Sequence, residues 1–180
     1  MKIVSKLFLT GITAATVFFA SCDKEDDPGN DNNNTAPNST DLNFLTQASY
    51  ANHNEILLSQ LALTKASNDS VKMFAQMLID DHTAAQTALD SLGTSYSQTL
   101  PNQADSAHSA IKTQLDSLMG NSFDSAFIAQ QVTDHQNAIN LFQNEIDNGN
   151  APAIKAYANN NLPKLQSHKQ TADSLSSHFQ

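Results

Sequence analysis

The stretch Val71–Leu92, VKMFAQMLIDDHTAAQTALDSL, decides the fold class. Its apolar residues recur at alternating spacings of three and four, which is the period of one face of an α-helix. That face consists of Val71, Phe74, Leu78, His82, Ala85, Leu89 and Leu92. We expect a helix over about 69–92 that ends at Gly93. One position near the middle of this apolar face is a histidine.

Three other segments repeat the pattern, and a shorter segment is also amphipathic. We expect long helices at about 41–66, 122–148 and 152–178, and a short one at about 104–119. The first begins at the capping residues 39–41, the third at Ser122, and the fourth at Pro152. Two short turns and one long connection join the four long helices. We predict an all-α fold, a ferritin-like four-helix bundle with a short extra helix between the second and third long helices. A generic helical domain with different pairing is the alternative.

One ionisable residue interrupts each long apolar face near its middle. These residues are Glu55, His82, His135 and His168. Each lies within about three residues, or about 5 Å, of the expected midpoint of its helix, so the four could meet at one level of a bundle. Three imidazoles and a carboxylate suit zinc, iron, copper or manganese. The alternative is a metal-free polar network that fixes helix register.

Two aspartates directly precede histidines of this set. Asp81 and Asp134 could orient the imidazole of a neighbouring helix as hydrogen-bond acceptors, or they could face water at the rim. His108, on the short helix, is expected to be a partly buried packing residue. The bundle lacks the paired Glu-x-x-His motif of di-iron proteins, so oxidase or peroxidase chemistry is not predicted. Nothing in the sequence indicates a substrate pocket, and an enzyme is the least favoured class.

The charge of the chain excludes several other classes. Its 180 residues include 9 Lys and Arg against 18 Asp and Glu, a net charge of −9, and all the basic residues are lysine. An acidic, arginine-free chain is poorly suited to nucleic acid, so we expect no nucleic-acid partner. Cys22 is the only cysteine, which excludes a disulfide framework and a thiolate metal cluster.

The first forty residues predict targeting and attachment. Lys2 and Lys6 precede an apolar run that is too short to span a bilayer, and the motif Phe19-Ala20-Ser21-Cys22 resembles a bacterial lipobox. We therefore expect residues 1–21 to be a lipoprotein signal peptide and Cys22 to be acylated. An ordinary secretory signal is the alternative.

The segment that follows is expected to be a tether. Residues 22–40 are acidic and Asn-rich, and they contain too few apolar side chains to fold. Residues 23–27 resemble the surface-export signal of lipoproteins from Bacteroidetes-type bacteria, or are a solvated start to the linker. We expect residues 41–180 to form the bundle, anchored to the cell envelope by the lipid at Cys22. The outer membrane is favoured, with a periplasmic or surface-exposed face; protein partners are not indicated.

Four motifs in order resemble a bacterial ferritin-like envelope family, domain of unknown function 4142. They are Glu55 followed by residues 57–62, Val71-Lys72-x-Phe74-Ala75 with Asp81-His82-Thr83, Phe123-Asp124-x-x-Phe127 leading to His135, and Leu162-Pro163-x-Leu165-x-x-His168. The resemblance implies a helical bundle in the cell envelope and brings no established activity. Two functional hypotheses remain: binding or buffering of a transition metal through the Glu/His cluster, or a metal-free interaction or stress-related module with a structural polar core.

Overall fold

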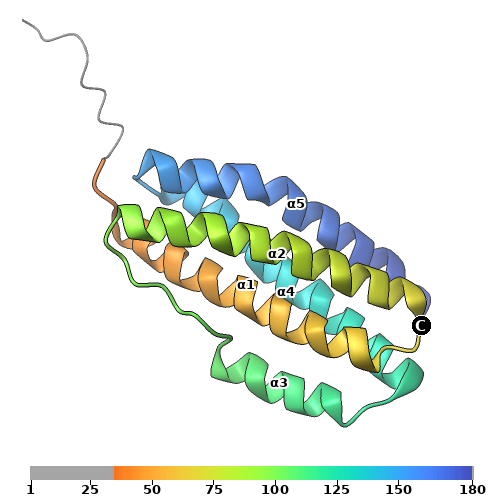
Figure 1. Ribbon diagram of the computed structural model, residues 1–180. Helices are drawn as coiled ribbons and strands as arrows, with labels where there is room; N and C mark the ends of the chain where they lie inside the picture. Colours follow the sequence, from red (N-terminus) through yellow and green to blue (C-terminus); the bar gives the residue numbers. More distant parts are fainter. Residues whose placement is uncertain (1–34, 180) are drawn as a thin grey trace, which may run out of the picture. The chain divides into compact units, whose positions relative to one another are not determined.

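The computed structural model describes residues 35–179, which contain five α-helices (Figure 1). They are α1 (Ser39–Lys65), α2 (Asp69–Ser95), α3 (Ser106–Asp116), α4 (Gly120–Asn148) and α5 (Pro152–Ser176). The predicted signal peptide, Cys22 and the tether up to residue 34 lie outside the described residues. Among the described helices, none combines the length and the apolar character that a membrane span requires.

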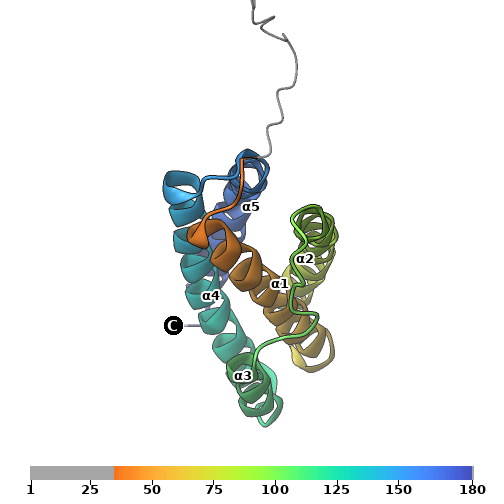
Figure 2. The same ribbon diagram turned by 90° about the vertical axis from the view of Figure 1, so that its left-hand side faces the viewer.

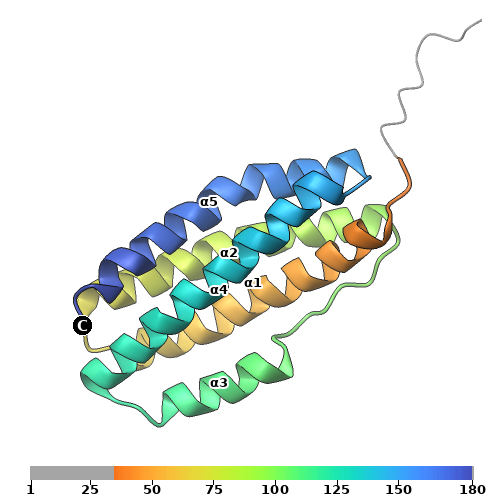
Figure 3. The same cartoon turned by 180° about the vertical axis from the view of Figure 1, so that it is seen from behind.

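The four long helices form two antiparallel hairpins that pack against each other. α1 pairs with α2, and α4 pairs with α5 (Figures 1 and 3). The chain between α2 and α4 runs the length of the bundle and carries α3, which lies on the outside against α1 and α4 (Figure 2). The all-α four-helix bundle with a short extra helix in this connection is therefore confirmed.

Several predicted helix ends move by one to three residues, and two of these ends lie at or next to a glycine. α2 continues past Gly93 to Ser95, and the carbonyl of Gly93 accepts hydrogen bonds from the backbone N–H groups of Tyr96 and Gln98. α4 begins at Gly120 rather than near Ser122. Gly120 has a φ of 58°, in the left-handed region that suits glycine, and it turns the chain directly into the helix.

One carboxylate ties the start of α1 to the start of α5. Asp41 completes a capping box with Asn38 at the α1 N-terminus. It also accepts hydrogen bonds from the backbone N–H groups of Asn150 and Ala151, which lead into α5. The two hairpins are thus joined at this end of the bundle by a buried side chain.

The hydrophobic core consists of two clusters with a polar layer between them. One cluster includes Leu58, Leu78, Ile128 and Ala172, and the other includes Ala48, Leu89, Ala138 and Leu165. On each long helix the interrupting residue lies between these two clusters: Glu55 on α1, His82 on α2, His135 on α4 and His168 on α5. The four residues therefore occupy one level of the bundle.

Candidate metal centre

Three histidines from three helices meet in this layer. One ring nitrogen from each of His82, His135 and His168 lies within 4.8 Å of the other two, and the residues are 4%, 1% and 2% exposed. Their ring centroids are 5.3 to 5.8 Å apart. Imidazoles packed this closely and buried this completely need either hydrogen bonds between them or a shared ion.

A chain of amides fixes the tautomer of His82. Gln86 donates from Nε2 to the carboxylate of Asp90, so its Oε1 is the atom that accepts from Nδ2 of Asn52. Asn52 consequently presents its oxygen to Nδ1 of His82 at 3.0 Å. His82 therefore carries its proton on Nδ1, and the lone pair on Nε2 has no partner.

The tautomers of the other two histidines are fixed by oxygen atoms that can only accept a hydrogen bond. His135 donates from Nδ1 to the backbone carbonyl of Gln131 at 2.9 Å. His168 donates from Nε2 to the carboxylate of Asp81 at 2.8 Å. The remaining nitrogens, Nε2 of His135 and Nδ1 of His168, face each other at 3.3 Å. Each therefore presents a lone pair to the other.

The electrostatics keep all three imidazoles neutral. Burial, and then the proximity of His135 and His168, hold the pKa of His82 well below its usual value. Burial lowers the pKa of His135 to about 4, and burial also lowers the pKa of His168. The result is three neutral nitrogen donors that converge with no hydrogen between them, which is the electronic arrangement that a cation satisfies.

Two of the three ligand nitrogens already have the spacing of ligands to one small ion, and the third lies within 4.8 Å of both. Three nitrogens at about 2.0–2.1 Å from an ion lie about 3.3–3.6 Å from one another, and the His135–His168 separation already has this value. A cavity of about 10 Å³ lies against His82 and His168, which is about the space of a single water-sized sphere.

Glu55 lies beside this group and not within it. Its Oε1 is 3.6 Å from Nδ1 of His135, the nitrogen already bonded to the carbonyl of Gln131, and the group of three does not include it. Burial, and then the negative charge of Asp134, raise the pKa of Glu55 to about 8. Its Oε2 is buried and has no hydrogen-bond partner.

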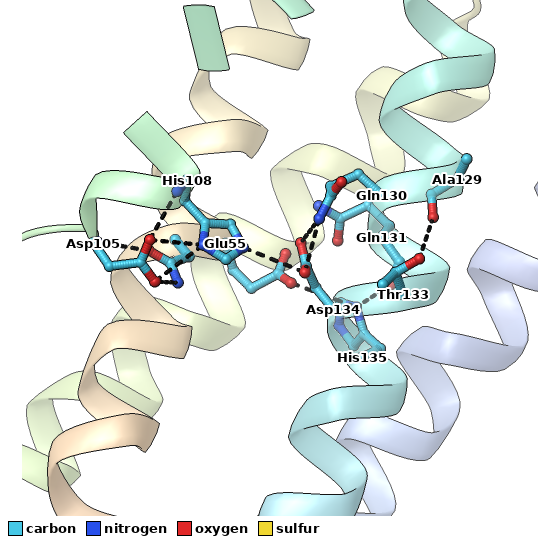
Figure 4. Close-up of polar contacts among 10 residues, drawn as sticks. Glu55, Asp105, His108, Ala129, Gln130, Gln131, Thr133, Asp134 and His135 are labelled. Atoms are coloured by element: carbon cyan, nitrogen blue, oxygen red, sulfur yellow. Dashed lines mark hydrogen bonds and ion pairs between the residues drawn. The ribbon is translucent and has the colours of Figure 1, made fainter. Parts of the chain in front are cut away.

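The two aspartates next to the histidines have different surroundings. Asp81 accepts a hydrogen bond from His168 of α5, a histidine of a neighbouring helix, as the sequence suggested it could. Asp134 instead accepts a hydrogen bond from His108 of α3 at 3.3 Å, and from Gln130 (Figure 4). His108 is more than a packing residue: its hydrogen bonds to Asp134 and Asp105 raise its pKa to about 9.

A second, larger cavity opens between α1 and α4. Its volume is about 250 Å³, and Glu55, His82 and His135 are among the residues that line it. Figure 4 shows the Glu55 side chain alongside the His108–Asp134 contact, on the side of α1 that faces α4. The sequence indicated no pocket at this level, because the cavity depends on how far α1 and α4 separate where α3 packs against them.

The chain matches one protein family over most of its length. Residues 27–175 match the family described as Domain of unknown function (DUF4142). The chain belongs to this family. No curated protein matches this DUF4142 chain.

Solved structures share the fold of this DUF4142 domain at low identity. A DUF305 fragment from Deinococcus radiodurans has a TM-score of 0.71 at 12% identity, covering 80% of this chain and 99% of the other. A putative secreted DUF305 protein from Streptomyces coelicolor has a TM-score of 0.68 at 10% identity, covering 78% and 92%. CopM in its Cu(I)-bound form has a TM-score of 0.66 at 17% identity, covering 79% and 99%. At these identities the likeness establishes the helical bundle alone.

Sequence reasoning missed the amides that orient the DUF4142 histidines. Asn52 and Gln86 are 4% and 6% exposed, and together they set the tautomer of His82. Asn52 lies three residues before Glu55, and Gln86 lies four residues after His82, so both helical spacings were visible in the sequence. Neither stood out because neither residue is ionisable.

Proposed function

We propose that this protein is a lipid-anchored envelope protein whose bundle binds one transition-metal ion through His82, His135 and His168. The observation that carries the proposal is the convergence of three imidazole lone pairs whose opposite nitrogens are all held by acceptors. Such a set is unfavourable without a cation, because the facing nitrogens repel each other and cannot share a hydrogen. Asp81 supports the site by orienting His168.

Copper is the ion that we favour, with zinc as the alternative. Three neutral imidazoles without a carboxylate suit copper or zinc better than manganese, which prefers oxygen ligands. Structures of CopM that share this fold hold Cu(I) and Ag. This likeness is consistent with a monovalent copper site, and the donor set of the present chain is the stronger reason.

Metal analysis of the full-length protein tests the proposal. We expect about one equivalent of copper or zinc per chain, and a large loss of affinity in His82→Gln, His135→Gln and His168→Gln, since each removes one of three ligands. His53→Gln is the control, because His53 lies outside the group of three. The metal-free network makes the opposite prediction: no stoichiometric metal, and the same destabilisation of each core variant with and without chelator.

Attachment through Cys22 has a separate test. Cys22→Ser should abolish acylation and release the protein from the membrane fraction. Fractionation and the mass of the mature protein measure both effects. A variant that stays in the membrane with an unchanged lipid mass would refute lipid attachment at Cys22. The proposal of a metal site would be unaffected.

A further inference from the structure

The three-histidine site adjoins a much larger cavity on one side than on the other. Between α1 and α4, a cavity of about 250 Å³ reaches His82 and His135. Between α2 and α5, the space against His82 and His168 is about 10 Å³, and Lys164 and Asp81, joined by an ion pair of 2.8 Å, are among the residues that line it. A metal ion that carries even part of its hydration shell fits the first space and not the second.

One unused carboxylate lies in the wall of the larger cavity. Glu55 is 4% exposed, its Oε2 has no hydrogen-bond partner, and its Oε1 is 3.6 Å from the ring of His135. A buried acid without a cationic partner costs stability, so its presence beside an open space points to a ligand that it meets there. Figure 4 shows that the side chain extends from α1 toward α4.

Glu55 is poorly placed to be a permanent ligand of the same ion. It approaches the Nδ1 edge of His135, whereas the free lone pair of His135 is on Nε2, across the ring. An ion bound to Glu55 is therefore separated from the three-histidine site by the ring of His135. Asp105, Asp134 and the protonated His108 between them line the same cavity, and the two carboxylates outnumber the one imidazolium, so this wall keeps a net negative charge that attracts cations.

We propose that the cavity between α1 and α4 is the route by which the metal ion reaches and leaves the three histidines, and that Glu55 is the carboxylate that holds the ion on the way. The proposal rests on the proposed metal site and adds a loading path to it. The ion first exchanges a water for an oxygen of Glu55, whose carboxyl proton passes to solvent in the cavity, and then exchanges that oxygen for imidazole nitrogen, after which Glu55 takes up a proton again. The carboxylate is thus a kinetic ligand, which changes rates and not the final affinity.

Stopped-flow kinetics of the full-length protein with Cu⁺, kept reduced, and with Zn²⁺ test the proposal. Glu55→Gln keeps the volume and removes the carboxyl group that can give up its proton and bind the ion, so loading and chelator-driven release should both slow by about tenfold or more, with the equilibrium affinity unchanged within about twofold. Ala51→Phe, which narrows the cavity, should also slow loading and release together. Ala88→Phe is the matched control, since Ala88 is exposed and lines neither cavity.

The possible outcomes distinguish the entry route, the role of Glu55 and the metal site itself. Unchanged rates in either Glu55→Gln or Ala51→Phe overturn the proposed route. A loss of equilibrium affinity in Glu55→Gln makes Glu55 a permanent ligand and overturns its kinetic role. If Ala51→Phe does not fold, Ala51→Leu replaces it. Absence of equilibrium metal binding in the unaltered protein refutes the proposed function and the route with it, whereas normal binding with unaltered rates refutes the route alone.

Discussion

At the scale of single residues, Asp81 sets which nitrogen of His168 is free. Its carboxylate accepts one hydrogen bond from Nε2 of His168 and another from the ammonium group of Lys164. Asp81→Asn offers an amide that can donate to Nε2 and so favour the wrong tautomer. We expect metal affinity to fall by about 10–100-fold, the usual effect of removing a group that orients a ligand. Calorimetric titration measures it.

The control for this substitution is its neighbour in the chain. Asp80 is exposed and accepts a hydrogen bond from Gln76 on the surface of α2. Asp80→Asn makes the same change of charge one residue away. Equal losses of affinity in Asp80→Asn and Asp81→Asn would mean that net charge matters and orientation does not.

Glu145 is a second buried acid, far from the histidines. It is 0% exposed, and it lies beside Asp41, whose carboxylate is already held by backbone N–H groups. Burial, and then Asp41, raise the pKa of Glu145 to about 8. Glu145 therefore binds a proton in the folded state that it would lose on unfolding at neutral pH. The stability that this proton brings is complete below the unfolded pKa of about 4.5 and is lost as pH rises through about 8.

Replacing this acid by its amide should stabilise the protein. In Glu145→Gln the amide donates to Asp41 without ionising, so we expect a gain of roughly 1–3 kcal/mol near neutral pH that grows up to about pH 8 and vanishes near pH 4. Thermal unfolding at several pH values measures it. Asp147→Asn, at an exposed position of the same helix, should show no such trend.

At the scale of elements, α3 is held by polar contacts more than by core packing. Asp105 caps α3 and exchanges two hydrogen bonds with Asn54 of α1. His108 bridges Asp105 to Asp134 of α4. Leu115 is the one fully buried side chain of this helix. The charge of one imidazole therefore contributes to the docking of α3, because His108 joins the carboxylates at its N-terminus and on α4.

The attachment of α3 should weaken in alkaline solution. The pKa of His108 is raised to about 9, so the stability from its protonated form is complete below the ordinary histidine pKa of 6.5 and is lost as pH rises through about 9. Hydrogen exchange of α3 amides, corrected for the intrinsic effect of pH, should accelerate over that range. The free energy of local opening of α3 should fall by about 1–3 kcal/mol. In His108→Gln the exchange should be fast throughout; pH-independent exchange in the unaltered protein would contradict the bridge.

The helices could be predicted from the sequence because each long one repeats its apolar period over six or seven turns. Their ends were harder, since Gly93 stays helical through contacts with later residues and Gly120 starts a helix through its own φ. The level of Glu55 and the three histidines also follows from spacing along each helix. The side toward which Glu55 points, and the partner of Asp134, depend on helix rotation and on α3, which no local pattern contains.

At the scale of the whole molecule, the polar layer is where the two hairpins need each other. His82 belongs to the α1–α2 hairpin, whereas His135 and His168 belong to the α4–α5 hairpin. Apolar clusters lie on both sides of the layer, so the bundle can fold around it without an ion. The layer itself, however, contains unpartnered atoms of Glu55, His82 and Gln131. A metal ion would relieve part of this cost and would join the two hairpins at mid-height.

Metal binding should therefore stabilise the bundle as a whole. A ligand at a hundredfold excess over its dissociation constant adds about 2.7 kcal/mol, which raises the melting temperature of a domain of this size by roughly 5–10 °C. His82→Gln is the informative variant, because it leaves both ligands of the second hairpin in place and removes the one that connects it to the first. In the unaltered protein, metal should slow hydrogen exchange at mid-height in α2, α4 and α5. In His82→Gln, protection in α2 should disappear even at metal concentrations that still occupy the remaining pair. Metal-dependent protection of α2 that survives in His82→Gln would show that the ion binds elsewhere and that the three histidines do not join the hairpins.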